Sequence, residues 1–161
     1  MSTASHAEHV QHNLARFFMS DITIPADNTA LQRVLDDLAF LDDWDERYRY
    51  LIDLGRAMPK LPPEGYADAN KVQGCASQVW LMLRPEEDRL VLQGDSDALI
   101  VKGLVALVIA MFNARPKAEI AAFDAQGFFA AIGLKDHLTQ QRSNGLASMV
   151  NRIKAAANAS G

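Results

Sequence analysis

The chain has 161 residues, of which 49% are hydrophobic and 22% are charged, and this composition is typical of one globular domain rather than of a disordered or collagen-like chain. Its 20 acidic and 16 basic side chains leave a formal net charge of −4, so the basic excess of a nucleic-acid-binding protein is missing and we expect no such partner. The chain has one cysteine, which excludes an internal disulfide and favours a reducing compartment; we therefore expect a cytoplasmic protein.

The first part of the chain reads as an extension that precedes the main domain. Apolar residues at helical spacing predict an amphipathic helix over residues 5–18, followed by a linker that contains Pro25. We interpret residues 1–28 as this extension and residues 29–161 as the domain. Three histidines of the extension are spaced by three: His6, His9 and His12. A helical zinc site needs an i, i+4 pair, so we expect these histidines on a solvated surface and predict no metal site.

Two amphipathic helices are expected next. Thr29 and Gln32 form a capping-box pattern at the start of the first, and the second runs from about Trp44 to Leu54 and ends at Gly55. Six acidic residues accompany them: Asp36, Asp37, Asp42, Asp43, Asp45 and Glu46. We interpret these as a solvated surface, and a site for a basic partner is the alternative.

The middle of the chain predicts a small sheet. Prolines and a glycine interrupt residues 59–65, which excludes a long helix there. The short apolar runs Val79–Leu83 and Leu90–Gln93 flank the polar segment 84–89, a pattern that predicts a β-hairpin. A third strand is expected near residues 71–74. No membrane span is expected, because the longest apolar run, residues 98–112, falls short of about 20 residues and contains a lysine.

The second half of the chain predicts helices. Residues 98–112 are apolar on nearly every face and therefore predict a central buried helix, preceded by the capping residues Asp95, Ser96 and Asp97. Further helices are expected to begin at Pro116, to span residues 124–132 before Gly133, and to follow Thr139. The last helix carries the apolar stripe Leu146, Met149, Val150 and Ile153. Helices, then a short antiparallel sheet, then helices indicate an α+β fold in which the sheet packs against several helices.

The single cysteine, Cys75, lies between the small residues Gly74 and Ala76, just before the first predicted strand. Small neighbours let the backbone turn and leave the sulfur accessible, as at a functional loop tip. A buried cysteine acting as a small core residue is the alternative. His137 is a candidate general base for such a thiol, although packing beside a helix start is the interpretation that we favour.

Two charged residues near the central helix have predicted roles. Arg142, at the start of the last helix, is expected to pair with the region of Asp95 and Asp97, and an exposed pair of this kind contributes about 1 kcal/mol or less. Lys102 lies within the apolar helix, where we expect its amine to extend to solvent.

Three separated segments resemble the SufE family of sulfur acceptors: Val72-Gln73-Gly74-Cys75-Ala76-Ser77-Gln78-Val79-Trp80, residues 94–104, and residues 137–146 with their Arg142-Ser143-Asn144-Gly145-Leu146 motif. Residues 44–61 also match the family. The likeness extends in order from about residue 30 to 158.

The resemblance implies a protein that accepts sulfane sulfur from a pyridoxal-phosphate-dependent cysteine desulfurase, of the SufS or the CsdA type, and passes it to an iron–sulfur cluster assembly complex. It implies a fold similar to that of iron–sulfur scaffold proteins, and it makes Cys75 the sulfur acceptor. The chain would be an activator of the enzyme and not an enzyme, with no cofactor of its own, because the pyridoxal phosphate belongs to the partner. The residues expected to shape the loop or bind the partner are Gln73, Gly74, Ser77, Gln78, Asp95, Ser96, Asp97 and Arg142.

Physical chemistry adds one expectation to this interpretation, and two alternatives to it stay open. Val72, Val79 and Trp80 lie close to Cys75 in the sequence and are candidates for an apolar shelter around a persulfide. Two other classes of function remain open: an independent thiol enzyme that uses Cys75 and His137, and a non-catalytic interaction module in which Cys75 is only part of the core.

Overall fold

The computed structural model describes residues 23–159, which form an α+β fold as predicted. The helices are α2 (Thr29–Phe40), α3 (Trp44–Arg56), α4 (Leu99–Phe112), α5 (Lys117–Ala122), α6 (Ala125–Ala131) and α7 (Gln140–Ala159). Short 3-10 turns are η1 (Pro63–Tyr66), η2 (Asp68–Asn70) and η3 (Leu134–His137), and the strands are β1 (Val79–Glu86), β2 (Arg89–Ser96) and β3 (Arg115–Pro116). None of the described helices is both long and apolar enough to cross a membrane.

The three strands form an antiparallel sheet in the order β1-β2-β3. The predicted hairpin is confirmed, but its strands are longer than expected, because the ladder continues to the Glu86–Arg89 pair and leaves only two residues in the turn. Glu87 has φ of 58°, the left-handed conformation that tight hairpin turns require. The predicted third strand near residues 71–74 is wrong: Lys71 forms only an isolated bridge with Trp80, and Arg115–Pro116 supplies the third strand.

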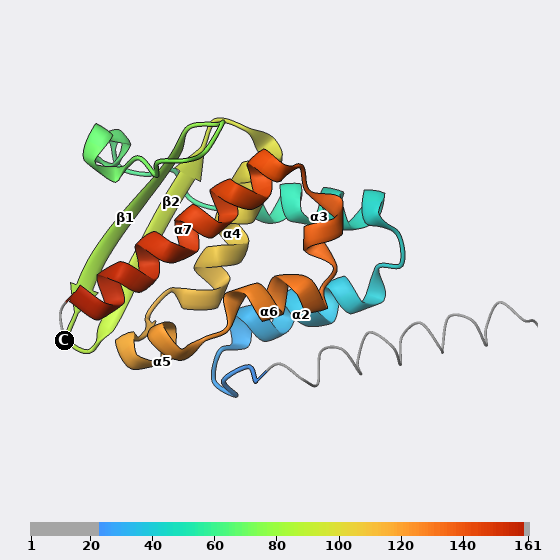
Figure 1. Cartoon of the computed structure of the whole chain (residues 1–161), viewed down its shortest axis with the longest axis horizontal. Coiled ribbons are helices and arrows are strands. Elements are labelled where there is room, and N and C mark those ends of the chain that lie inside the picture. The colour runs from blue at the N-terminus through green and yellow to red at the C-terminus, as the bar shows by residue number, and fades with distance from the viewer. Residues whose placement is uncertain (1–22, 160–161) are drawn as a thin grey trace, which may run out of the picture.

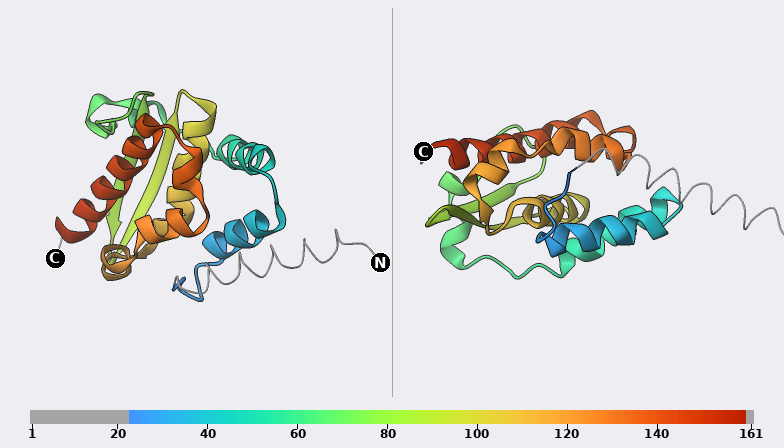
Figure 2. Two further views of the ribbon diagram at one scale, coloured as in Figure 1. Left: turned by 45° about the vertical axis from the view of Figure 1, so that its right-hand side comes forward. Right: turned by 90° about the horizontal axis from the view of Figure 1, so that it is seen from below.

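Helix α4 lies at the centre of the molecule, as its apolar sequence predicts. It packs against the sheet and against α2, α3 and α7, and nine of its 14 residues are buried. Figures 1 and 2 show α7 crossing one face of the sheet, whereas α2 lies on the other side of α4. Because α4 and the ends of β1 and β2 carry the predicted motif residues, this packing places distant parts of the sequence around one region.

A glycine contact joins α3 to α4. A Cβ atom on Gly103 would lie 2.7 Å from the carbonyl carbon of Leu51, and one on Gly55 would lie 2.7 Å from the backbone nitrogen of Gly103. The two helix backbones therefore approach each other closely, without side chains between them. The expectation that Gly55 ends its helix is wrong because this contact keeps it inside α3, which continues to Arg56.

Several other predicted helix ends are confirmed, and two more are wrong. Asp124 caps α6, Gly133 follows that helix with φ of 78°, and the Thr139 hydroxyl accepts a hydrogen bond from the backbone of the first turn of α7. Helix α2 is capped by Asn28 and not by Thr29, because the buried Asn28 side chain both caps the helix and donates to the carbonyl of Met111. Asp95 and Ser96 belong to β2, so neither is the N-cap of α4; that position is Ala98.

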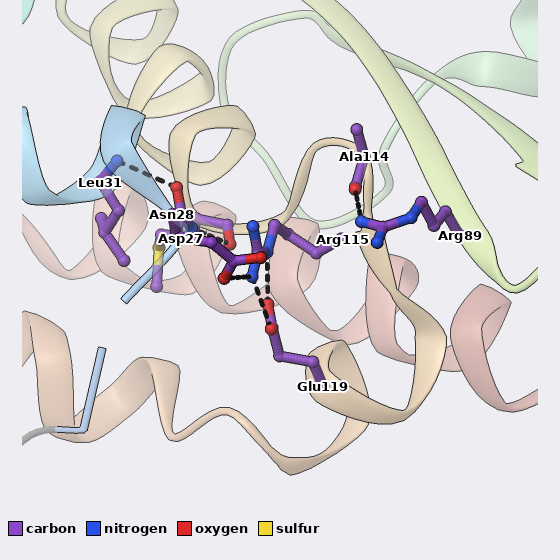
Figure 3. Close-up of polar contacts among 8 residues, drawn as sticks. Asp27, Asn28, Leu31, Arg89, Ala114, Arg115 and Glu119 are labelled. Atoms are coloured by element: carbon purple, nitrogen blue, oxygen red, sulfur yellow. Dashed lines mark hydrogen bonds and ion pairs between the residues drawn. The ribbon is translucent and has the colours of Figure 1, made fainter. Parts of the chain in front are cut away.

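An ion-pair network fastens the stretch before α2 to the body of the protein (Figure 3). The guanidinium of Arg115, only 9% exposed, lies 2.6 Å from a carboxylate oxygen of Asp27 and 2.6 Å from one of Glu119. Arg115 thereby links the start of α2 to α5. The predicted helix over residues 5–18 and the three histidines His6, His9 and His12 lie outside the described residues.

Candidate functional site

Cys75 lies on a short loop between η2 and β1. The base of this loop is closed by the hydrogen bond from the Val72 N–H to the Val79 carbonyl, 2.9 Å long. Gly74 has φ of 86°, a conformation that glycine adopts far more readily than other residues. A Cβ atom at Gly74 would also lie 2.8 Å from the hydroxyl of Ser148 on α7. The loop therefore needs a glycine beside Cys75, both for its turn and for its close approach to α7.

The sulfur of Cys75 rests against a gap in the surface of α7. Its Sγ lies 3.7 Å from the carbonyl oxygen of Gly145, and a Cβ atom on Gly145 would lie 3.1 Å from Sγ. The side chain of Cys75 is half-buried. The absence of a side chain at Gly145 thus makes room for the thiol. Gly145 belongs to a segment that resembles the family, but its contact with Cys75 is visible only in the packed structure.

A cavity of about 250 Å³ opens beside the thiol. Its lining residues come from the loop, from α4 and from the start of α7: Cys75, Ala76, Ser77, Val101, Thr139, Gln141, Arg142, Gly145 and Met149. None of the three residues expected to shelter a persulfide, Val72, Val79 and Trp80, lines this cavity. Val72 and Val79 are buried in the core, and the Trp80 ring packs edge-on against Tyr66 with 5.1 Å between centroids.

Burial raises the pKa of the Cys75 thiol above its usual range. A raised pKa in the folded protein means that the contribution of this thiol to stability is present below the pKa of the unfolded chain and is lost as the pH rises through the folded value. We expect the rate of Cys75 alkylation by iodoacetamide to reach half its maximum at a higher pH in the folded protein than in urea. Equal midpoints in the two conditions would contradict a tucked thiol.

Two residues of the second motif hold the far end of the Cys75 loop. A carboxylate oxygen of Asp97 accepts the Gln78 N–H at 3.0 Å, and the Ser96 hydroxyl donates to the Gln78 carbonyl at 2.8 Å. The structure therefore brings Gln78, Ser96 and Asp97 together. Their contacts fix the point where the loop joins β1.

Asp95 lies apart from this attachment, in a polar cluster of its own. It accepts hydrogen bonds from the Tyr66 hydroxyl at 2.6 Å and from the Ser96 N–H, and it lies 3.3 Å from the amine of Lys102. Although burial acts in the opposite direction, these three partners hold the pKa of Asp95 below its usual range. The side chain of Lys102 is 24% exposed, and its amine is held in this ion pair.

Arg142 lies at the Cys75 cavity and forms no ion pair with Asp95 or Asp97 within residues 23–159. The predicted pairing is wrong because the two aspartates are engaged by other partners. Of the remaining predicted residues, Ser77 lines the cavity and Gln73 is exposed on the loop. The sequence interpretation missed Val101, Gln141 and Met149, whose positions depend on how α4 and α7 pack.

His137 packs away from the thiol. Its ring stacks on Trp44 with 4.0 Å between centroids, and it is not among the residues that line the Cys75 cavity. This arrangement agrees with the packing role that we favoured from the sequence. Within the described part of the chain, no group of three or more histidine, cysteine or acidic side chains is placed to hold a metal ion.

Comparison with known proteins places the chain in a family. Residues 32–157 match the family described as SufE, an Fe-S metabolism associated domain. An uncharacterized SufE-like protein of Rhizobium etli is 53% identical over 129 residues, which cover 78% of this chain and 87% of the relative. A second uncharacterized SufE-like protein, of Rhizobium meliloti, is 50% identical over 133 residues, which cover 80% of this chain and 95% of that one.

A solved structure supports the fold. The solution structure of a hypothetical protein from Thermus thermophilus has a TM-score of 0.68 and 19% sequence identity, over 85% of this chain and 97% of the other. At this identity the likeness concerns the fold alone, and the family assignment rests on the sequence matches. The chain therefore belongs to the SufE family, whose domain is associated with Fe–S metabolism.

Proposed function

We propose that this protein accepts sulfur from a pyridoxal-phosphate-dependent cysteine desulfurase onto Cys75, stimulates the turnover of that enzyme, and carries the sulfur to iron–sulfur cluster assembly. The observation that carries the proposal is the position of the single cysteine, half-buried on a loop and open to a cavity of about 250 Å³. We propose that this cavity receives the second sulfur atom bonded to Sγ. The family supports a role in Fe–S metabolism.

The proposed transfer is an exchange between a thiolate and a persulfide. The Cys75 thiolate attacks the terminal sulfur of a persulfide on the desulfurase, a new S–S bond forms on Cys75, and the desulfurase cysteine leaves as a thiolate. One S–S bond breaks as another forms, so the step needs no external oxidant or reductant. The pyridoxal phosphate that generates the persulfide belongs to the partner, and the proposed step requires no cofactor bound to this chain.

A single cysteine suits a carrier. A second thiol close to Cys75 would attack the inner sulfur of the persulfide, form a disulfide and release the cargo as sulfide. The sequence contains no second cysteine. The tucked position of Cys75 against Gly145 also limits access of reductants to the bound sulfur.

The same tucked position requires the loop to move. With Sγ against Gly145 of α7, the thiol contacts the body of the protein and does not project from it. We propose that residues 73–77 swing outward when the desulfurase binds. Amide hydrogen exchange in this loop is then expected to accelerate in the complex, and unchanged exchange would contradict the movement.

The described contacts favour this function over the two alternatives. A thiol hydrolase needs His137 within hydrogen-bond reach of Cys75, whereas His137 stacks on Trp44 and does not line the cavity. A purely structural cysteine would be enclosed by the core, whereas Cys75 borders a cavity.

The proposal is tested by measuring alanine release from cysteine by a desulfurase of the SufS type, and separately by one of the CsdA type, with and without this protein. We expect faster release with one of the two enzymes. No acceleration with either would contradict the proposed role as activator.

A further inference from the structure

Arg152 joins helix α7 to the segment that leads into the Cys75 loop. One guanidinium nitrogen donates to the carbonyl of Lys71, and the other donates to the carbonyl of Ala69 at 2.5 Å. The guanidinium is planar and its donors have fixed directions, so two bonds of this kind set the position of the segment as well as its distance from the helix. Neither the family motifs nor the cavity lining includes Arg152.

The same face of α7 carries three consecutive contacts to this segment. Gly145, Ser148 and Arg152 are spaced i, i+3 and i+7, which places them along one side of a helix. Gly145 faces Cys75, and Ser148 faces Gly74. Arg152 binds the carbonyls of Lys71 and Ala69, which precede Gly74 and Cys75 in the chain. The segment therefore runs along α7, and Arg152 lies at the end farthest from the thiol.

The two ends of the loop are held independently. Ser96 and Asp97 hold Gln78 where the loop joins β1, whereas Arg152 holds Lys71 and Ala69 on the other side. The backbone bond from Val72 to Val79 and the isolated bridge between Lys71 and Trp80 connect the two attachments directly. Without Arg152, the preceding segment keeps its pairing to β1 but loses its bonds to α7.

We propose that Arg152 is a positioning residue that aligns the Cys75 loop along α7, so that the thiol rests in the gap at Gly145. The gap has room for the sulfur only at a residue without a side chain, since a Cβ atom there already approaches Sγ to 3.1 Å. The neighbouring positions on this part of the helix, Arg142 and Ser148, carry side chains. A shift of the loop along α7 therefore moves the sulfur out of its resting place and toward solvent. The consequence for sulfur transfer rests on the proposed function, but the alignment itself is a property of the isolated protein.

The test is the rate at which iodoacetamide alkylates Cys75 in the folded, isolated protein, compared between the parent chain and Arg152→Ala. We expect alkylation to be several-fold faster in Arg152→Ala. Loss of a nearby positive charge would by itself disfavour the Cys75 thiolate and slow its alkylation. Faster alkylation therefore cannot come from the change in charge and reports the movement of the loop. Arg152→Lys keeps the charge but replaces the planar guanidinium, whose donors have fixed directions, with a single ammonium nitrogen, and its rate is expected to fall between those of the parent and Arg152→Ala.

Lys154→Ala is the matched control. Lys154 lies one residue beyond Ile153 on the same helix and donates to the carbonyls of Ile120, Ala121 and Phe123 near the end of α5. Lys154 is therefore also a basic residue of α7 that binds backbone carbonyls, but its carbonyls lie away from the Cys75 loop. Removal of its side chain is expected to leave the alkylation rate of Cys75 unchanged. A parental rate in Arg152→Ala, or an equal acceleration in Lys154→Ala, would overturn the proposal. If Arg152→Ala does not fold, Arg152→Lys decides, and a parental rate in that variant overturns it.

No desulfurase is present in these measurements. A negative result would therefore remove the positioning role and leave sulfur acceptance by Cys75 intact. Conversely, absence of sulfur transfer in the enzymatic assay would not alter the alkylation result.

Discussion

The Cys75→Ser variant is expected to fold like the parent chain and to lose all stimulation of the desulfurase. Serine preserves the size of the side chain on a half-buried loop, so the free energy of unfolding should change by about 1 kcal/mol or less. The hydroxyl of serine is almost fully protonated at neutral pH and does not replace a thiolate as acceptor of sulfane sulfur. Alanine release by the desulfurase, measured with each protein, checks the expectation.

A control variant separates loss of the thiol from general effects of substitution. Arg84 lies on β1 with its side chain 73% exposed, and Arg84→Ala is expected to stimulate the desulfurase like the parent. Stimulation by Cys75→Ser at the parental level would show that the thiol is not the acceptor. Urea denaturation of both variants confirms that each is folded under the assay conditions.

The Gly103→Ala variant is expected to be strongly destabilised. The added methyl group would lie 2.7 Å from the carbonyl carbon of Leu51, against helix backbone that does not rotate away as a flexible side chain does. Forcing α3 and α4 apart disturbs the centre of the core, and overpacking of this kind costs about 3 kcal/mol. The shift of the urea denaturation midpoint measures the effect.

Whether Gly103→Ala lowers or raises the free energy of unfolding distinguishes the effect of close packing from that of intrinsic helix preference. Alanine is favoured over glycine in a helix interior by about 1 kcal/mol, so without the contact Gly103→Ala would stabilise the protein. Gly55→Ala approaches the same contact from the other helix and should also destabilise, since its methyl group would meet the backbone nitrogen of Gly103 at 2.7 Å. An increase in stability in either variant would contradict the packing of α3 on α4.

Local sequence patterns predicted those features of the fold that depend on neighbouring residues. The continuous apolar run predicted the buried helix α4, and the alternation around the turn predicted the β1-β2 hairpin. The two-residue strand β3 is too short to have a periodicity, and it exists because Arg115 and Pro116 meet β2 at the end of the central helix. Asn28 became the cap of α2 for a similar reason, since its amide also reaches the distant carbonyl of Met111.

In the candidate site, too, the sequence predicts individual residues but not their contacts with distant parts of the chain. Cys75 was identifiable because it is the single cysteine and has small neighbours, and the motif around Asp97 was identifiable from its resemblance to the family. The partners of these residues were not identifiable, because each contact joins residues far apart in the chain. Charge alone pairs Arg142 with the aspartates, whereas the fold places Lys102 beside Asp95.

The most direct test of the account is the intact mass of the protein after incubation with a desulfurase and cysteine, followed by removal of the enzyme. We expect an increase equal to the mass of one sulfur atom, located on the peptide that contains Cys75 and removed by a thiol reductant. An unchanged mass in the presence of a desulfurase whose turnover the protein accelerates, or an added sulfur that persists in Cys75→Ser, would contradict it.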